Sequence, residues 1–230
     1  MWSIHEAISA LRSCRPVLIY DSAERENEVD MVFHSSCVDR DVIYTLRTVA
    51  GGLICFTIPH YMARFLGIKF LAEYLRSDPY VARIAMKRPS YGDEPAFSVW
   101  VNHIDVRTGI SDEDRALTIS RLYRVAELIY HGRWWDARNI FLEEFLAPGH
   151  VPILIGRPLE LRRGHTELSL ALAHLAGLVP STTIAEVLSR YRSASIEEAE
   201  RIARELDAPL IDSSQIIAAV KTLGNPDMHR

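Results

Sequence analysis

Short apolar segments alternate with helical segments along nearly the whole chain, and this alternation constrains the fold more than any other feature. Apolar runs typical of strands occupy residues 17–21, 53–58, 96–105 and 150–156. No Gly/Ser-rich linker, repeat or low-complexity run divides the chain. We therefore predict an α+β fold of α/β-like character. A single three-layer domain, residues 1–230, would have a mixed twisted β-sheet covered by helices on both faces.

The remaining predicted elements fit between these strands. Two further short strands are expected at residues 31–35 and 209–212. Helices are expected wherever a capping residue precedes a helical apolar period. They cover residues 3–12, 39–49, short pieces within 60–88, 111–132, 166–176, a stretch beginning near Thr183, 195–206 and 213–223.

Composition excludes several classes of protein. The formal net charge is −4, so no basic field favours nucleic acid or an anionic membrane, and we predict neither as a partner. No apolar run approaches the roughly 18 residues of a membrane span, and the N-terminal segment lacks the features of a signal peptide. Three cysteines, Cys14, Cys37 and Cys55, cannot form an even disulfide framework. A reducing cytosol suits them best, which predicts a cytoplasmic protein.

The first segment that indicates chemistry is Arg25-Glu26-Asn27-Glu28-Val29-Asp30, directly after the strand that ends at Asp21. Its three acids repel one another unless a positive group lies among them. Hard oxygen ligands at the tip of a strand suit Mg²⁺ or Mn²⁺. The alternative is a solvated acidic turn.

The second segment is Arg162-Arg163-Gly164-His165-Thr166-Glu167, which opens a predicted helix. A glycine before a helix lets an anion approach the backbone N–H groups, and arginine and threonine would complete a phosphate cradle. His165 lies beside that cradle and could ligate a metal that bridges to the same substrate. The alternative is a helix cap with a surface histidine. Together the two segments indicate a metal-dependent enzyme acting on a small phosphorylated sugar.

Three other residues are weaker candidates. His150 follows Pro148-Gly149 in a predicted turn, and Glu186 could act as a general acid or base. For His150 the alternative is an ordinary loop residue, and for Glu186 it is the partner of Thr183 in a capping box. Cys55 lies in an apolar strand and is typical of plain core.

An ordered set of segments resembles the 3,4-dihydroxy-2-butanone-4-phosphate synthases of riboflavin biosynthesis and spans almost the whole chain. The matching segments are RENEVD (25–30), GGLICFTI (51–58), AFSVWVNH with TGISDEDRALTI (108–119), PGHV (148–151), RRGHTE (162–167) and LAGLVPSTTIAE (175–186). The resemblance implies a lyase that converts D-ribulose 5-phosphate to 3,4-dihydroxy-2-butanone 4-phosphate and formate through a metal-stabilised enediolate and acid–base catalysis. It also implies Mg²⁺ or Mn²⁺, as a pair at each site, no organic cofactor, and a homodimer with sites near the interface.

The resemblance also assigns roles to individual residues. Glu26 and His165 match the metal ligands, and both also belong to the substrate site. His150 and Glu186 match the two positions essential for catalysis. The other substrate-binding positions are Arg25, Asp30, Arg162, Gly164 and Thr166. Supporting roles fall to Asp21, Glu28, Cys55, Thr108 and Asp114.

The chain departs from the family pattern at three places. Val29 stands where the family often has glycine, Pro152 where a phenylalanine is common, and residues 189–192 replace an acidic segment. None of these changes removes a proposed ligand or catalytic group. We expect them to affect the lid segment that closes over the substrate, and the rate at which it closes. Many relatives carry a GTP cyclohydrolase II domain, and we expect the stand-alone form without one.

The same residues also fit two other functions. One is another metal-dependent isomerase or aldolase acting on a similar sugar phosphate, which would release no formate. The other is a non-catalytic module of related fold that binds phosphate or metal. A pure binder needs no separate acid and base, so the joint presence of His150 and Glu186 favours an enzyme.

Overall fold

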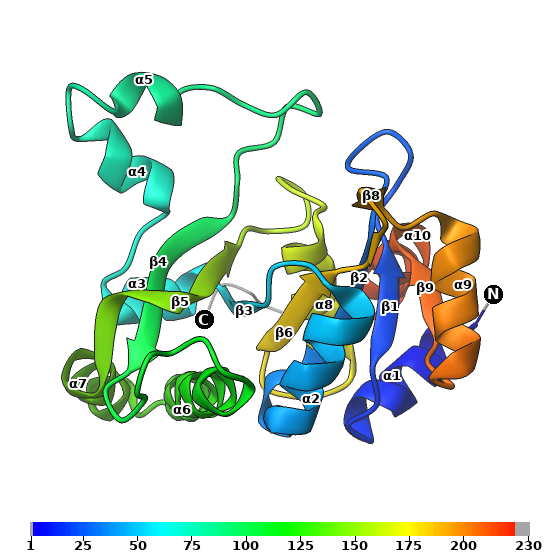
Figure 1. The fold of residues 1–230 in the computed structure, drawn as a ribbon, viewed down its shortest axis with the longest axis horizontal. Helices are drawn as coiled ribbons and strands as arrows, with labels where there is room; N and C mark the ends of the chain where they lie inside the picture. The colour runs from blue at the N-terminus through cyan, green and yellow to red at the C-terminus, as the bar shows by residue number, and fades with distance from the viewer. Residues whose placement is uncertain (1, 224–230) are drawn as a thin grey trace.

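The computed structural model describes residues 2–223, and the centre of this part is a seven-stranded mixed sheet (Figure 1). The strand order is β4-β5-β3-β6-β2-β1-β9. The β1–β9 and β3–β5 pairs are parallel, and the other neighbours are antiparallel. These strands are β1 (Val17–Tyr20), β2 (Val29–His34), β3 (Cys55–Pro59), β4 (Phe97–His103), β5 (Phe145–Gly156), β6 (Thr182–Glu186) and β9 (Leu210–Asp212), and a separate ribbon pairs β7 (Leu188–Ser189) with β8 (Arg192–Ser193).

Ten α-helices surround the sheet in the described part of the chain. They are α1 (Ile4–Arg12), α2 (Arg40–Thr45), α3 (His60–Leu66), α4 (Leu71–Arg76), α5 (Ala82–Ala85), α6 (Asp112–Tyr130), α7 (Trp134–Glu144), α8 (His165–Leu175), α9 (Ile196–Glu205) and α10 (Ser213–Leu223), with a 3₁₀ turn η1 (Ser35–Cys37) and a π turn η2 (Leu46–Ala50). In Figure 1, α4 and α5 form an arm at the upper left that projects beyond the sheet, next to β4. Across residues 2–223 we find no helix with the length and apolar character of a membrane span.

The two faces of the sheet bury alternate residues of the same strands, as the two-residue period of a strand requires. On β1, Val17 and Ile19 belong to an apolar cluster with α1, α8 and α10. Leu18, between them, belongs to the larger cluster built with α2, α3, α6, α7 and α9. The predicted α+β architecture, with a mixed sheet between two helical layers, is therefore confirmed.

Most predicted elements are also confirmed. Ser3 caps α1 in a capping box with Glu6, and Ser111 accepts a hydrogen bond from the backbone N–H of Asp114 at the start of α6. Helix α7, which carries Trp134 and Trp135, was not predicted.

The helix predicted to begin near Thr183 is wrong, because this segment forms β6 in the middle of the sheet. Thr182, Thr183 and Ile184 are β-branched, and such residues favour strands. The spacing of Thr183 and Glu186 imitates a capping box. The Glu186 carboxylate instead accepts a hydrogen bond from the backbone N–H of Leu53 at 2.8 Å. The capping explanation for Glu186 is therefore also wrong.

His150 does not lie in a turn before a strand, as predicted, but within β5. On β4, Val101 pairs with Val151 while its neighbour Asn102 pairs with Leu146. Residues 147–150 therefore form an insertion in the ladder, and they include a cis peptide bond before Pro148.

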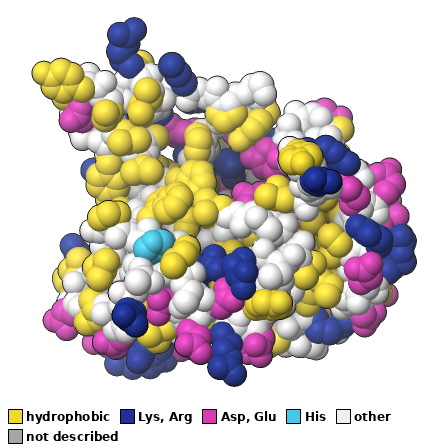
Figure 2. Space-filling view, in the orientation of Figure 1, with side chains coloured by type: hydrophobic (Ala, Val, Ile, Leu, Met, Phe, Trp, Pro, Cys, Tyr) yellow, Lys and Arg dark blue, Asp and Glu magenta, His cyan; other side chains and the backbone are white. Residues whose placement is uncertain are grey.

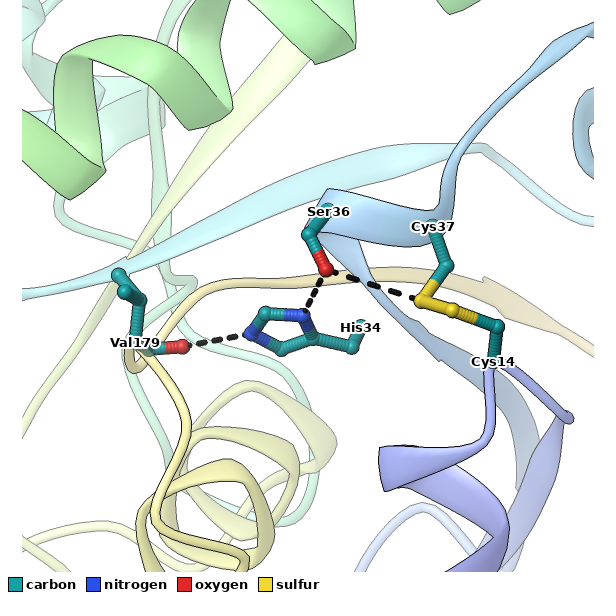
Figure 3. Close-up of a disulfide and its surroundings, with 5 residues drawn as sticks. All are labelled: Cys14, His34, Ser36, Cys37 and Val179. Atoms are coloured by element: carbon teal, nitrogen blue, oxygen red, sulfur yellow. Dashed lines mark hydrogen bonds between the residues drawn. A yellow bond between two sulfur atoms is a disulfide. The ribbon is translucent and has the colours of Figure 1, made fainter.

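The odd number of cysteines did not predict a disulfide, yet Cys14 and Cys37 form one, with their Cα atoms 5.4 Å apart (Figure 3). Cys14 follows α1 and Cys37 lies in η1. The antiparallel pairing of β1 with β2 brings these positions together, although 23 residues separate them. Cys55 remains a buried free thiol.

Candidate active site

The acidic loop between β1 and β2 is organised by the buried carboxylate of Asp21. It accepts hydrogen bonds from the backbone N–H groups of Glu26 at 2.9 Å and Glu28 at 3.0 Å. Asn27, between them, adopts the left-handed conformation that asparagine tolerates, with φ of 56°. The loop is therefore a folded, hydrogen-bonded turn and not the solvated acidic turn considered from the sequence.

His165 is the first residue of α8 and points at this loop. Its Nδ1 lies 3.2 Å from Glu26 Oε2 and 3.5 Å from Asp30 Oδ1. Its Nε2 lies 3.2 Å from the backbone carbonyl of Glu28. The histidine is buried, with 5% of its surface exposed, so it is not the surface histidine of the alternative interpretation.

Asp21, Glu26 and His165 each offer one ligand atom, and these atoms lie within 4.8 Å of one another. Carboxylate oxygens with one imidazole suit Mg²⁺ or Mn²⁺. Asp30 adds a buried carboxylate oxygen, Oδ1, that has no hydrogen-bond partner among residues 2–223. The donor set and this unpaired oxygen fit a divalent cation. The Glu28 carboxylate turns away and accepts a hydrogen bond from Ser193.

Electrostatics at this cluster are strongly perturbed. Burial raises the pKa of Glu26, but hydrogen bonds and charges from His165 and Arg25 outweigh it and lower the pKa to about 2. Burial raises the pKa of Asp30 to about 7. Burial alone would lower the pKa of His165, yet the surrounding carboxylates raise it to about 9. Groups shifted this far by burial and specific partners are typical of functional sites.

A pair of arginines flanks the cluster. Arg25 pairs with Asp21 at 3.1 Å and with Glu26 at 3.0 Å. Arg162 pairs with Glu167, a fully buried residue that also accepts from the backbone N–H of Gly164.

Gly164 is the N-cap of α8, and a Cβ atom there would collide with Arg162. Thr166 is the buried second residue of the helix. The arrangement places two guanidinium groups at a helix N-terminus, where an anion is favoured.

Glu186 reaches the same end of the sheet from β6. It pairs with Asp30 across β2 and β6, and its charge contributes to the raised pKa of Asp30. Cys55 lies on the other side of β6, and burial, with the charges of Glu186 and Asp30, raises the pKa of its thiol well above the usual range. A thiol that resists ionisation agrees with Cys55 as core.

The remaining candidates form a second group around Asn102 of β4, with His150 on β5, Thr108 in the loop after β4 and Asp114 in α6. Asn102 accepts from the backbone N–H of His150 at 2.8 Å, and its side-chain nitrogen lies 3.1 Å from His150 Nδ1. The same nitrogen donates to the carbonyl of Thr108 at 3.3 Å. Asp114 accepts from the backbone N–H of Gly109 at 2.9 Å. Thr108 and Asp114 therefore fix the loop that follows β4 and contacts Asn102. Asn102 in turn is hydrogen-bonded to the exposed His150.

Three residues of these two groups were not predicted. Asn102 looks like an ordinary strand residue, and no sequence signal marks its contact with His150. Tyr91 and Asp93 lie in a Pro/Gly-containing segment before β4, where the ring centroid of Tyr91 lies 5.0 Å from the Arg25 guanidinium carbon. In that segment, the only sequence signal of a functional role is an acidic and an aromatic residue on either side of a glycine. Figure 2 shows acidic and basic side chains gathered around a hollow in the upper half of this face.

Comparisons with known proteins show to which family the chain is similar. The family model of 3,4-dihydroxy-2-butanone 4-phosphate synthase matches residues 5–219. An Archaeoglobus fulgidus 3,4-dihydroxy-2-butanone 4-phosphate synthase is 38% identical over 221 residues, covering 92% of this chain and 91% of the relative. A Methanosarcina mazei protein of the same name is 33% identical over 227 residues, covering 94% and 90%.

Among solved structures, a 3,4-dihydroxy-2-butanone 4-phosphate synthase in complex with two magnesium ions has the same fold. Its TM-score is 0.74 at 23% identity, with 96% of this chain and 98% of that chain covered. The match of the family model and the identity to the archaeal relatives extend over nearly the whole chain. The chain therefore belongs to the 3,4-dihydroxy-2-butanone 4-phosphate synthase family.

Proposed function

We propose that the protein converts D-ribulose 5-phosphate to 3,4-dihydroxy-2-butanone 4-phosphate and formate for riboflavin biosynthesis. The observation that carries this proposal is the contact of His165 with Glu26 and Asp30 beside the Arg25–Arg162 pair. A cation site next to an anion cradle suits a substrate that combines sugar oxygens with a phosphate.

Glu26 and His165 would hold Mg²⁺ or Mn²⁺, as a pair of ions, with Asp21 and Asp30 within reach. A divalent cation stabilises negative charge that develops on an oxygen such as that of an enediolate. No organic cofactor takes part in this proposal. Arg25, Arg162, Gly164 and Thr166 would bind the phosphate, and Asp30 would contact the sugar.

Glu186 and His150 would move protons. The reaction removes a proton beside a carbonyl, loses water and releases a one-carbon acid, so it needs both a base and an acid. Glu186 is positioned by its hydrogen bond from Leu53, and His150 by Asn102. Thr108, Asp114, Glu28 and Cys55 would support the walls of the site.

The proposal includes a cytoplasmic homodimer in which residues 1–230 act as one domain. His150 is exposed on the single chain, and a partner near the site would enclose it. In a reducing compartment Cys14 and Cys37 would be thiols.

The decisive experiment incubates the purified protein with ribulose 5-phosphate and Mg²⁺ and measures formate. We expect formate in a one-to-one ratio with the four-carbon product, loss of activity with EDTA, and recovery with Mg²⁺ or Mn²⁺. An isomerised sugar phosphate without formate would reject the lyase in favour of an isomerase. Full activity after exhaustive chelation would reject the metal site.

A further inference from the structure

The side chains of Arg25 and Arg162 converge on the backbone of Gly164. A Cβ atom built on Gly164 would lie 2.7 Å from Arg25 Nη2 and 2.3 Å from Arg162 Nη1. The two side chains are 10% and 8% exposed. Two cations buried side by side require an anion, because their mutual repulsion is weakly screened away from water.

The protein satisfies this pair only in part. Arg25 Nη2 and Arg162 Nε are buried and have no hydrogen-bond partner within the described part of the chain. An unpaired buried donor costs about 1–3 kcal/mol, so such donors usually have a partner in the working state of a protein. One of these donors lies on each arginine of the pair, and together with the convergence of the two side chains on Gly164 they point to an anion site with spare capacity.

Asp93 already contributes one negative charge to the pair. Its Oδ2 lies 2.8 Å from Arg25 Nε and 4.0 Å from Arg162 Nε, and the side chain is 28% exposed. The neighbouring Glu94 pairs with Arg157 at 2.9 Å and with Arg76. Residues 91–94 therefore attach to four arginines, and only Asp93 faces the Arg25–Arg162 pair among the two acids of this segment.

We propose that Asp93 is an internal counter-ion shared by Arg25 and Arg162, in addition to the acids that each arginine pairs with separately, and that the phosphate of the substrate displaces it. The inference rests on the proposed function for the identity of the phosphate carrier. A phosphate dianion brings three strong acceptor oxygens and about two charges, so it can pair the donors that Asp93 leaves idle. A neutral or singly charged ligand gains less binding energy from the two arginines when it displaces Asp93. Competition with Asp93 therefore favours dianions over ligands of lower charge.

The test measures binding of inorganic phosphate to the full chain by calorimetry in the presence of Mg²⁺. Asp93→Asn keeps the shape of the side chain and removes its charge, so phosphate no longer competes with a carboxylate. We expect binding on the order of tenfold tighter than for the wild type. The matched control is Glu94→Gln, which removes one charge from the same segment but from other arginines. We expect a change of less than twofold for this control.

Two outcomes would overturn the inference. Unchanged or weaker phosphate binding by Asp93→Asn would mean that Asp93 only orients the arginines. Equal tightening by both variants would mean a long-range charge effect without displacement. Thermal unfolding of each variant verifies that the fold is retained.

The result also separates this inference from the proposed function. Phosphate calorimetry needs no turnover, so tighter binding without any formate release would reject the reaction and keep the displacement of Asp93. Formate release with no effect of Asp93→Asn on phosphate binding would reject the displacement and keep the reaction.

Discussion

A buried histidine lies at each end of strand β2, and the pKa values of the two histidines are shifted in opposite directions. At the start of the strand, His165 contacts the Glu28 carbonyl and the Asp30 carboxylate. At its end, His34 is the last residue of the strand, next to the Cys14–Cys37 disulfide (Figure 3). The two residues are 5% and 2% exposed. Burial therefore does not distinguish them.

Their partners do. Both ring nitrogens of His165 face acceptors, namely Glu26 and the Glu28 carbonyl, and the nearby carboxylates raise its pKa to about 9 against the effect of burial. The ring of His34 lies between the Val179 carbonyl, at 2.8 Å from Nε2, and the Ser36 hydroxyl, at 2.6 Å from Nδ1. Burial lowers the pKa of His34, and the bond to Val179 offsets it only in part.

This contrast supports the proposal of His165, and not His34, as a metal ligand. A divalent cation needs ligands that already bear negative charge around the imidazole, and β2 supplies them only at its Asp30 end. A neutral histidine between a carbonyl and a hydroxyl connects segments of the fold. Variants of the two ends should therefore separate catalysis from stability.

Glu26→Gln should give the largest effect. It keeps the size of the side chain and removes the charge of a proposed metal ligand, and transition-state stabilisation by a metal amounts to several kcal/mol. We expect formate release to fall by about 10³-fold, together with Mg²⁺ affinity. Glu24→Gln is the matched control, because Glu24 is an exposed acid of the same loop and should retain full activity. Comparable activity of the two variants would remove Glu26 from the proposed metal site.

Glu186→Gln and His150→Asn should give the next largest effect. Loss of a general acid or base lowers the rate by about 10²-fold or more. Glutamine retains an oxygen that can accept from the Leu53 N–H, so the free energy of unfolding should change by less than about 0.5 kcal/mol. Both variants should retain Mg²⁺ affinity, because neither residue is a proposed ligand.

His131→Asn serves as the control for His150→Asn, since His131 is an exposed histidine that follows α6. Near-normal formate release by both Glu186→Gln and His150→Asn would refute the catalytic pair. The metal and phosphate sites would not be affected by that result.

The residues proposed to hold the metal, at the Asp30 end of β2, stood out more clearly in the sequence than Asp93 and Asn102 did. Arg25–Asp30 and Arg162–Glu167 are contiguous segments, so local charge and the glycine before α8 already indicated their chemistry. Asp93 and Asn102 act through contacts with residues 68 and 48 positions away, which only the folded chain brings together.

The errors have a similar origin. Thr183 and Glu186 have the spacing of a capping box, and local spacing could not reveal that this segment is held between β2 and β3. The Cys14–Cys37 disulfide depends on the pairing of β1 with β2, which a cysteine count does not contain. Long-range pairing decides between local patterns that are each plausible.

The smallest expected effect is the pH dependence of stability that the two histidines contribute, with opposite signs. The pKa of His34 is lowered below the ordinary 6.5, so its contribution is present above pH 6.5 and is lost as the pH falls through the lowered value. The pKa of His165 is raised to about 9, so in metal-free protein its contribution is present below pH 6.5 and is lost as the pH rises through about 9.

His34→Gln tests the first of these contributions in isolation. We expect urea unfolding of metal-free protein to show that the variant is less stable than the wild type at pH 8, and that the difference shrinks towards pH 5. The slope cannot exceed about 1.4 kcal/mol per pH unit, because one proton is involved. Formate release at pH 8 should stay within about twofold of the wild type, since His34 lies at the opposite end of β2 from the metal cluster. All other titrating groups are common to the two proteins and cancel in the difference.

A stability difference that stays constant from pH 8 to pH 5 would mean that His34 has the same pKa in the folded and the unfolded protein. In that case the contrast between the two ends of β2 would reduce to the carboxylates around His165 alone.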